Sequence, residues 1–168
     1  MSNILDRKHA HKRLRDLYLK NQKEKHPDIP DRLRPMPPSY SDKTSNGLTK
    51  AISDFLRFNS HQVERISVTG RYIKDKPTKL MAGDVAGMVP ENVGGKWIKS
   101  SMTRGSADIS ATIQGLSVKI EVKIGRDRQS EAQKEYQRQV ESAGGLYVIA
   151  TSFNQFFGWY QSKFGEGR

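Results

Sequence analysis

The clearest hydrophobic pattern in the chain is a two-residue alternation between Gly105 and Lys123. Apolar side chains occupy every second position in two runs, which is the period of strands with one buried face. The runs meet at Gln114-Gly115, and glycine at the second position of a two-residue turn favours a tight hairpin. The apolar positions are Ala107, Ile109, Ala111, Ile113, Leu116, Val118, Ile120 and Val122. The pattern therefore predicts an antiparallel hairpin.

A tight turn fixes which residues of this hairpin face each other. If the loop has two residues, Ile113 pairs with Leu116, and counting outward places Asp108 opposite Glu121. Like charges at opposite positions destabilise a sheet, so we expect a positive group beside them. Lys123 lies on the same face, and a divalent cation could neutralise the remaining charge. A bulge in the turn would shift the count by one and remove the pairing.

Periods of three and four residues predict helices on both sides of the hairpin. A basic helix is expected over about residues 4–24, and an amphipathic helix from Asn46 to Asn59. Ser130 and Gln133 fit a capping box at the start of a third helix. Ser152 could cap a last helix that holds core-packing aromatic residues. The third helix is expected to bury a stripe of four side chains, Ala132, Tyr136, Val140 and Ala143.

Two further strands and a long irregular segment complete the pattern. A strand is expected over about residues 62–69, and the continuous apolar run from Leu146 to Ala150 predicts a strand buried on both faces. Residues 74–104 predict a long loop or irregular hairpin, with Trp97 and Ile98 as its best strand candidates. The order α-β-β-β-α-β-α predicts an α/β (α+β) fold in which helices flank a mixed central sheet.

Composition narrows the classes of function. The 168 residues carry 29 Lys and Arg against 18 Asp and Glu, a net charge of +11 that points to a polyanion such as nucleic acid. No apolar run approaches the roughly 18 residues of a membrane span, so we expect no membrane partner. The chain has no cysteine, which excludes disulfides and thiolate metal sites and favours a cytosolic setting.

Residues 1–45 differ in composition from the rest and predict an N-terminal extension to a domain over residues 46–168. The extension is basic, and five of the seven prolines lie between Pro27 and Pro38. We interpret it as an appendage without a core of its own. It could lie along a phosphate backbone, strap two copies together, or form a solvated tail.

The hairpin carries the residues that could perform chemistry. Mg²⁺ prefers hard oxygen ligands and is often held by one or two carboxylates together with substrate phosphates. Asp108 and Glu121 could supply carboxylate oxygens, and Val122 a backbone carbonyl. Lys123 could orient an attacking water or offset charge in the transition state. Gln133 could reach this site or only complete the helix cap. The plainer alternative is that the charged residues form the solvent face of an amphipathic strand.

The chain resembles the PD-(D/E)XK nuclease superfamily in three segments: GSAD at residues 105–108, IEVK at residues 120–123 and QSEAQKEYQRQVESAGGLYVIA at residues 129–150. Within the superfamily it is similar to the virus-type replication-repair nuclease domain, VRR-NUC. The resemblance covers roughly Asn46 to Lys163 and implies a restriction-endonuclease-like core. It implies that Asp108, Glu121 and Lys123 are the metal-binding and catalytic residues, with Gln133 as the motif glutamine.

Two departures from the family pattern concern Ala107 and the first helix of the domain. Ala107 stands where the family usually has proline, a residue that carries no chemistry. The helix from Asn46 to Asn59 lacks the glutamate that often supports a metal or its water. Asp54 or Glu64 could replace it, and the choice between one metal and two stays open.

The resemblance implies a Mg²⁺- or Mn²⁺-dependent DNA endonuclease. Relatives that stand alone tend to be homodimers that cut branched DNA. The resemblance therefore also implies a possible homodimer that acts in DNA repair, in a prokaryotic or phage-infected cell. Two alternatives remain: a non-catalytic nucleic-acid-binding module with the same fold, and an RNA-processing nuclease. The basic residues that could contact phosphates are Arg71, Arg104, Arg126, Arg128, Lys134 and Arg138.

Overall fold

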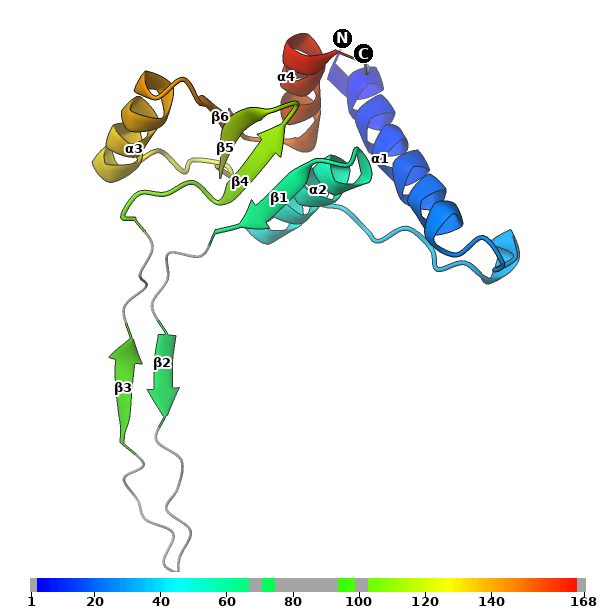
Figure 1. Cartoon of the computed structure of the whole chain (residues 1–168), viewed down its shortest axis with the longest axis horizontal. Coiled ribbons are helices and arrows are strands. Elements are labelled where there is room, and N and C mark those ends of the chain that lie inside the picture. Colours follow the sequence, from blue (N-terminus) through cyan, green and yellow to red (C-terminus); the bar gives the residue numbers. More distant parts are fainter. Residues whose placement is uncertain (1–2, 67–70, 75–93, 99–102, 166–168) are drawn as a thin grey trace, which may run out of the picture. The chain divides into compact units, whose positions relative to one another are not determined.

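A computed structural model describes residues 3–66, 71–74, 94–98 and 103–165. The chain divides into two compact units, one formed by Met1–Ile66 with Arg104–Arg168 and the other by Ser67–Thr103. The first unit contains the predicted hairpin and all but two of the helices and strands that the structure describes (Figure 1). The second unit contains a short two-stranded sheet.

The first unit is built on a mixed four-stranded sheet in the order β1-β4-β5-β6. Its strands are β1 (Gln62–Arg65), β4 (Ile109–Ile113), β5 (Leu116–Val122) and β6 (Leu146–Ala150). The pairs β1/β4 and β4/β5 are antiparallel, whereas β5/β6 is parallel. The predicted class is therefore confirmed, because helices flank a mixed central sheet (Figure 1).

The β4–β5 hairpin has the predicted tight turn. Ile113 pairs with Leu116 and Ile109 with Ile120, so the register contains no bulge. Gln114 and Gly115 both have positive φ, 49° and 84°, as a type I′ turn requires. This turn matches the right-handed twist of the two strands and fixes their register.

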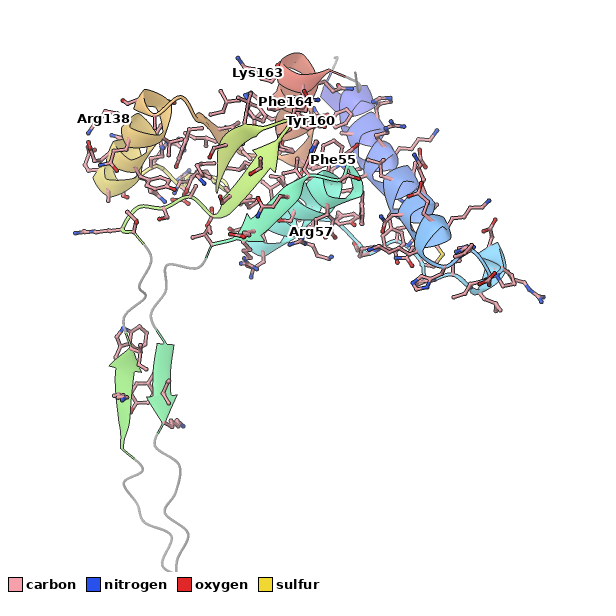
Figure 2. The ribbon with its side chains drawn as sticks, viewed as in Figure 1. Phe55, Arg57, Arg138, Tyr160, Lys163 and Phe164 are labelled. Carbon is pink, nitrogen blue, oxygen red and sulfur yellow. The ribbon has the colours of Figure 1, made fainter. Side chains whose placement is uncertain are left out.

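An aromatic cluster fills the core on one face of the sheet. It joins α2 (Ser45–Phe58) to α4 (Phe153–Phe164), whose N-caps are Thr44 and Ser152. The Phe55 ring lies edge-on to four rings of α4 with centroids 5.0–6.2 Å apart, and Figure 2 labels it beside Tyr160. The prediction of core-packing aromatics in the last helix is thus confirmed.

Helix α1 (Asn3–Lys25) is part of this core, so the prediction of an appendage over residues 1–45 is wrong. Ala10, Leu14 and Leu17 are buried in the main cluster, and the Tyr18 ring meets Phe58 edge-on. The predicted helix itself is confirmed, and a single 3₁₀ turn, η1 (Asp31–Leu33), follows it. The basic residues lie on the exposed face of α1. Its buried face carries an apolar stripe of three residues, which packs against α2 and α4.

Two further predictions need correction. Helix α3 (Glu131–Ser142) contains no fully buried residue, and its predicted stripe is only half-buried, with Ala143 exposed after the helix ends. Strand β6 lies at the edge of the sheet, and only its Val148 and Ala150 are buried, while the side chains on its other face are half-buried. Both differences have one cause, because α3 covers its face of the sheet only in part.

The second unit contains β2 (Arg71–Lys74) paired antiparallel with β3 (Gly95–Ile98). Trp97 and Ile98 lie in a strand, as predicted, whereas β2 was not predicted. The rest of the expected irregular segment, including Lys99, falls largely outside the described residues. The predicted strand over residues 62–69 is seen to Arg65, and residues 67–69 also lie outside the description. No described helix has the length and apolar character of a membrane span.

Leu14→Ala tests whether α1 belongs to the core in solution. Because Leu14 is fully buried, its truncation leaves a cavity, and we expect a loss of about 2–5 kcal/mol in the free energy of unfolding. Leu19→Ala is the matched control in the same helix, since Leu19 is 44% exposed, and it should cost less than about 1 kcal/mol. Urea unfolding followed by circular dichroism measures both; equal losses would place α1 outside the core.

Candidate active site

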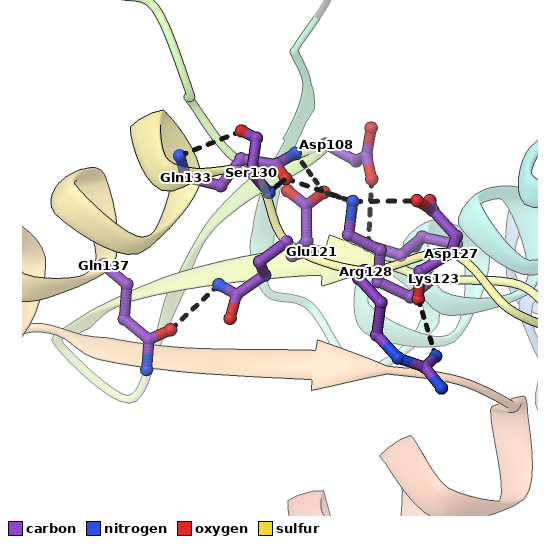
Figure 3. A network of polar contacts seen from close by, with 10 residues as sticks. Asp108, Glu121, Lys123, Asp127, Arg128, Ser130, Gln133 and Gln137 are labelled. Atoms are coloured by element: carbon purple, nitrogen blue, oxygen red, sulfur yellow. Dashed lines mark hydrogen bonds and ion pairs between the residues drawn. The ribbon is translucent and has the colours of Figure 1, made fainter.

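Polar side chains gather on the sheet face that the aromatic core leaves uncovered. The alternation of β5 directs Val118, Ile120 and Val122 into the core, so Glu121 points to the opposite face. Lys123 follows on that face, and the turn after it leads to the first residues of α3. Figure 3 shows these side chains in one network with Asp108 and Gln133.

Glu121 is the centre of the network. Its side chain is only 3% exposed. Oε1 accepts a hydrogen bond from Gln133 Nε2 at 2.5 Å and forms an ion pair with Lys123 Nζ at 3.0 Å. Oε2 is buried and has no hydrogen-bond partner among the described residues. Burial raises the pKa of Glu121, and the nearby carboxylates of Asp108 and Asp127 raise it further, against the lowering effect of Lys123.

Lys123 is held by three acceptors. Its Nζ lies 3.0 Å from Glu121 Oε1, 3.3 Å from Asp127 Oδ2 and 3.1 Å from Gln133 Oε1. Burial alone would lower the pKa of Lys123, but Glu121 and Asp127 outweigh it and raise the pKa. The contacts with Glu121 and Asp127 therefore favour the protonated amine, which donates hydrogen bonds and offsets negative charge.

Asp108 lies one residue before β4, at the end of the hairpin where Glu121 is found. Its Oδ2 accepts a hydrogen bond from Val122 N–H at 2.8 Å, and its own carbonyl accepts from Ile66 N–H at 2.8 Å. The register leads from the last ladder pair, Ile109 with Ile120, to Asp108 beside Glu121. Because N–H and C=O of one residue in an extended strand point the same way, the Val122 carbonyl is directed to the Asp108 side.

Gln133 performs both roles that the sequence leaves open. Its backbone N–H donates to Ser130 Oγ at 3.3 Å, and its Oε1 accepts from Ser130 N–H at 2.9 Å, which completes the capping box. The same side chain contacts Glu121 and Lys123 (Figure 3). One amide thus joins the start of α3 to both buried charges.

Gly105 sets the distance between the Asp108 segment and α3. Its φ is +84°, and a Cβ at this position would lie 2.3 Å from the carbonyl oxygen of Ala132. Both the backbone conformation and the space therefore require glycine. The close approach places the residues before Asp108 directly on the first turn of the helix that carries Gln133.

A cleft of about 430 Å³ adjoins the network. Three cations line it, Lys123, Arg128 and Lys134, so the structure brings together two of the predicted phosphate contacts. Arg128 donates to the Asp127 carbonyl at 3.0 Å, and Lys134 pairs with Glu131 at 2.8 Å. The other lining residues are Asp127, Gln129, Ile149 and Thr151.

Of the basic candidates whose side chains the structure describes, Arg104, Arg126 and Arg138 do not line this cleft. Arg138 is exposed on α3, where Figure 2 labels it, and it pairs with Glu135. Arg104 and Arg126 are exposed in turns, and Arg71 belongs to the second unit.

Neither acid proposed to replace the missing helix glutamate shows a contact with the network. The Asp54 carboxylate accepts from Tyr40 and pairs with Lys50 and Arg57, and its helix packs on the core side of the sheet. Glu64 is exposed on β1 opposite Ser110. Among these acids, only Glu64 lies on the same sheet face as Glu121.

Two residues near the network were missed by the sequence reading. Asp127 pairs with Lys123, and its position depends on the turn after β5, which has no periodic pattern. Tyr147 has a buried hydroxyl on β6, and burial together with Glu121 and Asp108 raises its pKa. The sequence holds one sign of this role, a tyrosine hydroxyl inside the apolar run Leu146–Ala150. A buried tyrosine normally requires a polar neighbour, so a polar site beside this strand could have been predicted.

The donor set fits a hard divalent cation. Within the described part of the chain no cluster of three or more His, Cys, Asp or Glu side chains is found. Mg²⁺, however, needs only one or two carboxylates and keeps several waters. The uncompensated Oε2 of Glu121, with Asp108 and the Val122 carbonyl, meets that smaller requirement.

A scan against protein-family models and a search of curated proteins gave no match for this chain.

Glu121→Gln tests the raised pKa through the pH dependence of stability. A carboxyl group whose pKa is raised on folding contributes stability below its ordinary value of 4.5, and this contribution is lost as the pH rises through the folded-state pKa. We therefore expect the stability of the wild type relative to Glu121→Gln to fall as the pH rises above 4.5. Thermal unfolding in chelator measures it.

Glu24→Gln is the control at an exposed acid, because Glu24 is 61% exposed and pairs at the surface with Lys20, at 3.8 Å, where water screens the pair. Its difference from the wild type should not follow the same trend. A flat difference for Glu121→Gln as well would contradict the raised pKa.

Gly105→Ala tests the contact between the Asp108 segment and α3. Gly125→Ala is the matched control, since Gly125 also has positive φ, +60°, but has open space around it. Gly125→Ala should cost only the conformational penalty, about 1–2 kcal/mol. Gly105→Ala should cost clearly more, because the methyl group also pushes α3 away. Chemical unfolding measures both, and equal losses would show that the contact is absent in solution.

Proposed function

We propose that this protein is a metal-dependent nuclease that hydrolyses phosphodiester bonds in DNA, as its resemblance to PD-(D/E)XK nucleases implies. The observation that carries the proposal is the buried Glu121 carboxylate, which has one oxygen bonded and the other without a hydrogen-bond partner among the described residues. A buried acceptor without a partner costs about 1–3 kcal/mol of stability. A divalent cation bound to Oε2 of Glu121 would compensate this cost.

A purely structural ion pair explains the network less well. Buried ion pairs stabilise a protein only when the remaining lone pairs are also satisfied. Here Lys123 and Gln133 both contact Oε1, and no described residue bonds Oε2. The raised pKa of Glu121 agrees with incomplete compensation of its charge.

The metal would be held by Asp108, Glu121 and the Val122 carbonyl, and the residues around it have separable roles. When bound, the cation would lower the pKa of a bound water and polarise a phosphoryl oxygen. Gln133 orients the Glu121 carboxylate by holding Oε1. Lys123 is placed to offset the charge that develops in the transition state, and it would donate to a phosphate oxygen by releasing the exposed Asp127.

The cleft beside Lys123 supports a nucleic-acid substrate. Arg128 and Lys134 line it with positive charge, and the net charge of +11 favours a polyanion. That the substrate is branched DNA and the active form a homodimer rests on the family resemblance alone. An intracellular setting, where DNA is found, agrees with the absence of cysteine.

Cleavage assays test the proposal with labelled linear, nicked and four-way DNA and with RNA. We expect cutting in Mg²⁺ or Mn²⁺ that chelator abolishes, and a loss of about 100-fold or more in Glu121→Gln and Lys123→Met. Glu141→Gln, an exposed acid on α3, is the control and should cut as the wild type does. Calorimetry should show Mn²⁺ binding that Glu121→Gln loses, which reads out the metal site independently of activity.

Each other outcome points elsewhere. Cutting that persists in Glu121→Gln would sink the site assignment. Tight binding without metal-dependent cutting of any substrate would favour a non-catalytic binding module. Cutting of RNA alone would make the protein an RNA-processing nuclease.

A further inference from the structure

The second unit exposes an unusual concentration of large apolar side chains. We call the pair β2 (Arg71–Lys74) and β3 (Gly95–Ile98) the ribbon. Four of its eight residues are large and exposed: Tyr72 at 50%, Ile73 at 41%, Trp97 at 62% and Ile98 at 43%. A two-stranded sheet is only marginally stable in water by itself. Exposed aromatic residues on so small an element point to a binding surface.

The two aromatic residues share one face of the ribbon. Tyr72 is directly opposite Trp97, and the next pair on that face is Lys74 with Gly95. A Cβ at Gly95 would lie 2.5 Å from the Tyr72 hydroxyl oxygen and 2.6 Å from its ring carbon Cζ. The Tyr72 ring therefore lies over the Gly95 backbone, in space that any other residue would fill. One side of the ring is supported by the ribbon, while half of the side chain stays accessible.

The charge of the ribbon identifies the kind of partner. Its eight residues include Arg71, Lys74 and Lys96 and contain no acid. Aromatic side chains combined with cations bind single-stranded nucleic acids, because bases stack on the rings and phosphates meet the cations. A second copy of the ribbon would instead bring like charges together, which disfavours self-association.

We propose that the ribbon is a stacking platform for unpaired bases of single-stranded nucleic acid. Tyr72 and Trp97 stack on bases, and Lys74, on the same face of the ribbon, contacts a phosphate. This binding site lies in a different unit from Glu121 and does not depend on cleavage. It would give the protein a preference for unpaired strands, which the cleft beside Lys123 by itself does not provide.

Tryptophan fluorescence tests the proposal directly, because the chain has two tryptophans. Trp159 is half-buried against the core of the first unit. Trp159→Phe leaves Trp97 as the only tryptophan, and Trp97→Phe leaves Trp159. Both variants carry Glu121→Gln and are studied in chelator, which separates binding from any cutting. Single-stranded oligothymidylate should quench the emission of Trp97 and leave that of Trp159 unchanged. A blunt duplex of equal length should quench Trp97 much less.

Affinity gives a second measurement in the otherwise native chain. Trp97→Ala should weaken binding of a labelled oligothymidylate by about tenfold or more, the loss of one stacked base. Leu33→Ala is the control, since Leu33 is 67% exposed in the first unit, and it should bind as the wild type does. Circular dichroism should show all variants folded.

Three results would overturn the proposal. The first is that oligothymidylate binds without changing the emission of Trp97, and that Trp97→Ala binds it as tightly as the wild type does. The second is no binding of single strands at low salt. The third is a Trp97 emission that changes with protein concentration alone, together with a dimer in sedimentation, which would assign the ribbon to contact between two copies. Failure of the cleavage assays would leave each of these readouts intact.

Discussion

The buried charge of Glu121 is the constraint on which the site depends. A carboxylate removed from water must be compensated nearby, and the fold does so with Lys123 from the same strand face and Gln133 from α3. Gln133 can reach Glu121 only because α3 begins where it does, and Gly105 allows the chain to pass directly against that first turn. The position of one helix terminus therefore decides the geometry of the buried charges.

The two faces of the sheet have opposite energetic roles. On one face the aromatic rings around Phe55 and the apolar stripe of α1 form a dense core. On the other face α3 covers the sheet loosely, and the polar network includes a Glu121 oxygen that no described side chain or backbone group bonds. Stability gained in the core offsets the unfavourable burial at the network. The two-residue alternation of β5 is what separates these roles along a single strand.

Local rules explain what could be predicted from the sequence. The hairpin register follows from the alternation and from Gln114-Gly115, and the cap at Ser130 follows from its spacing to Gln133. The core role of α1 depends on distant partners in α2 and α4, so its basic composition was misleading. Strand β2 is too short for a period to show, and Asp127 lies in a turn whose path only the fold determines.

The double use of Gln133 couples folding of the helix terminus to order at the site. Its amide accepts from the Ser130 backbone and from Lys123 while it donates to Glu121, so no single contact can change alone. Loss of the cap would weaken the hold of Gln133 on both buried charges, which would stay paired with each other. Conversely, a cation that fixes Oε2 of Glu121 would favour the Oε1 contact and strengthen the start of α3. The helix cap is thus part of the site, and a helix propensity scale alone would not reveal why this position holds glutamine.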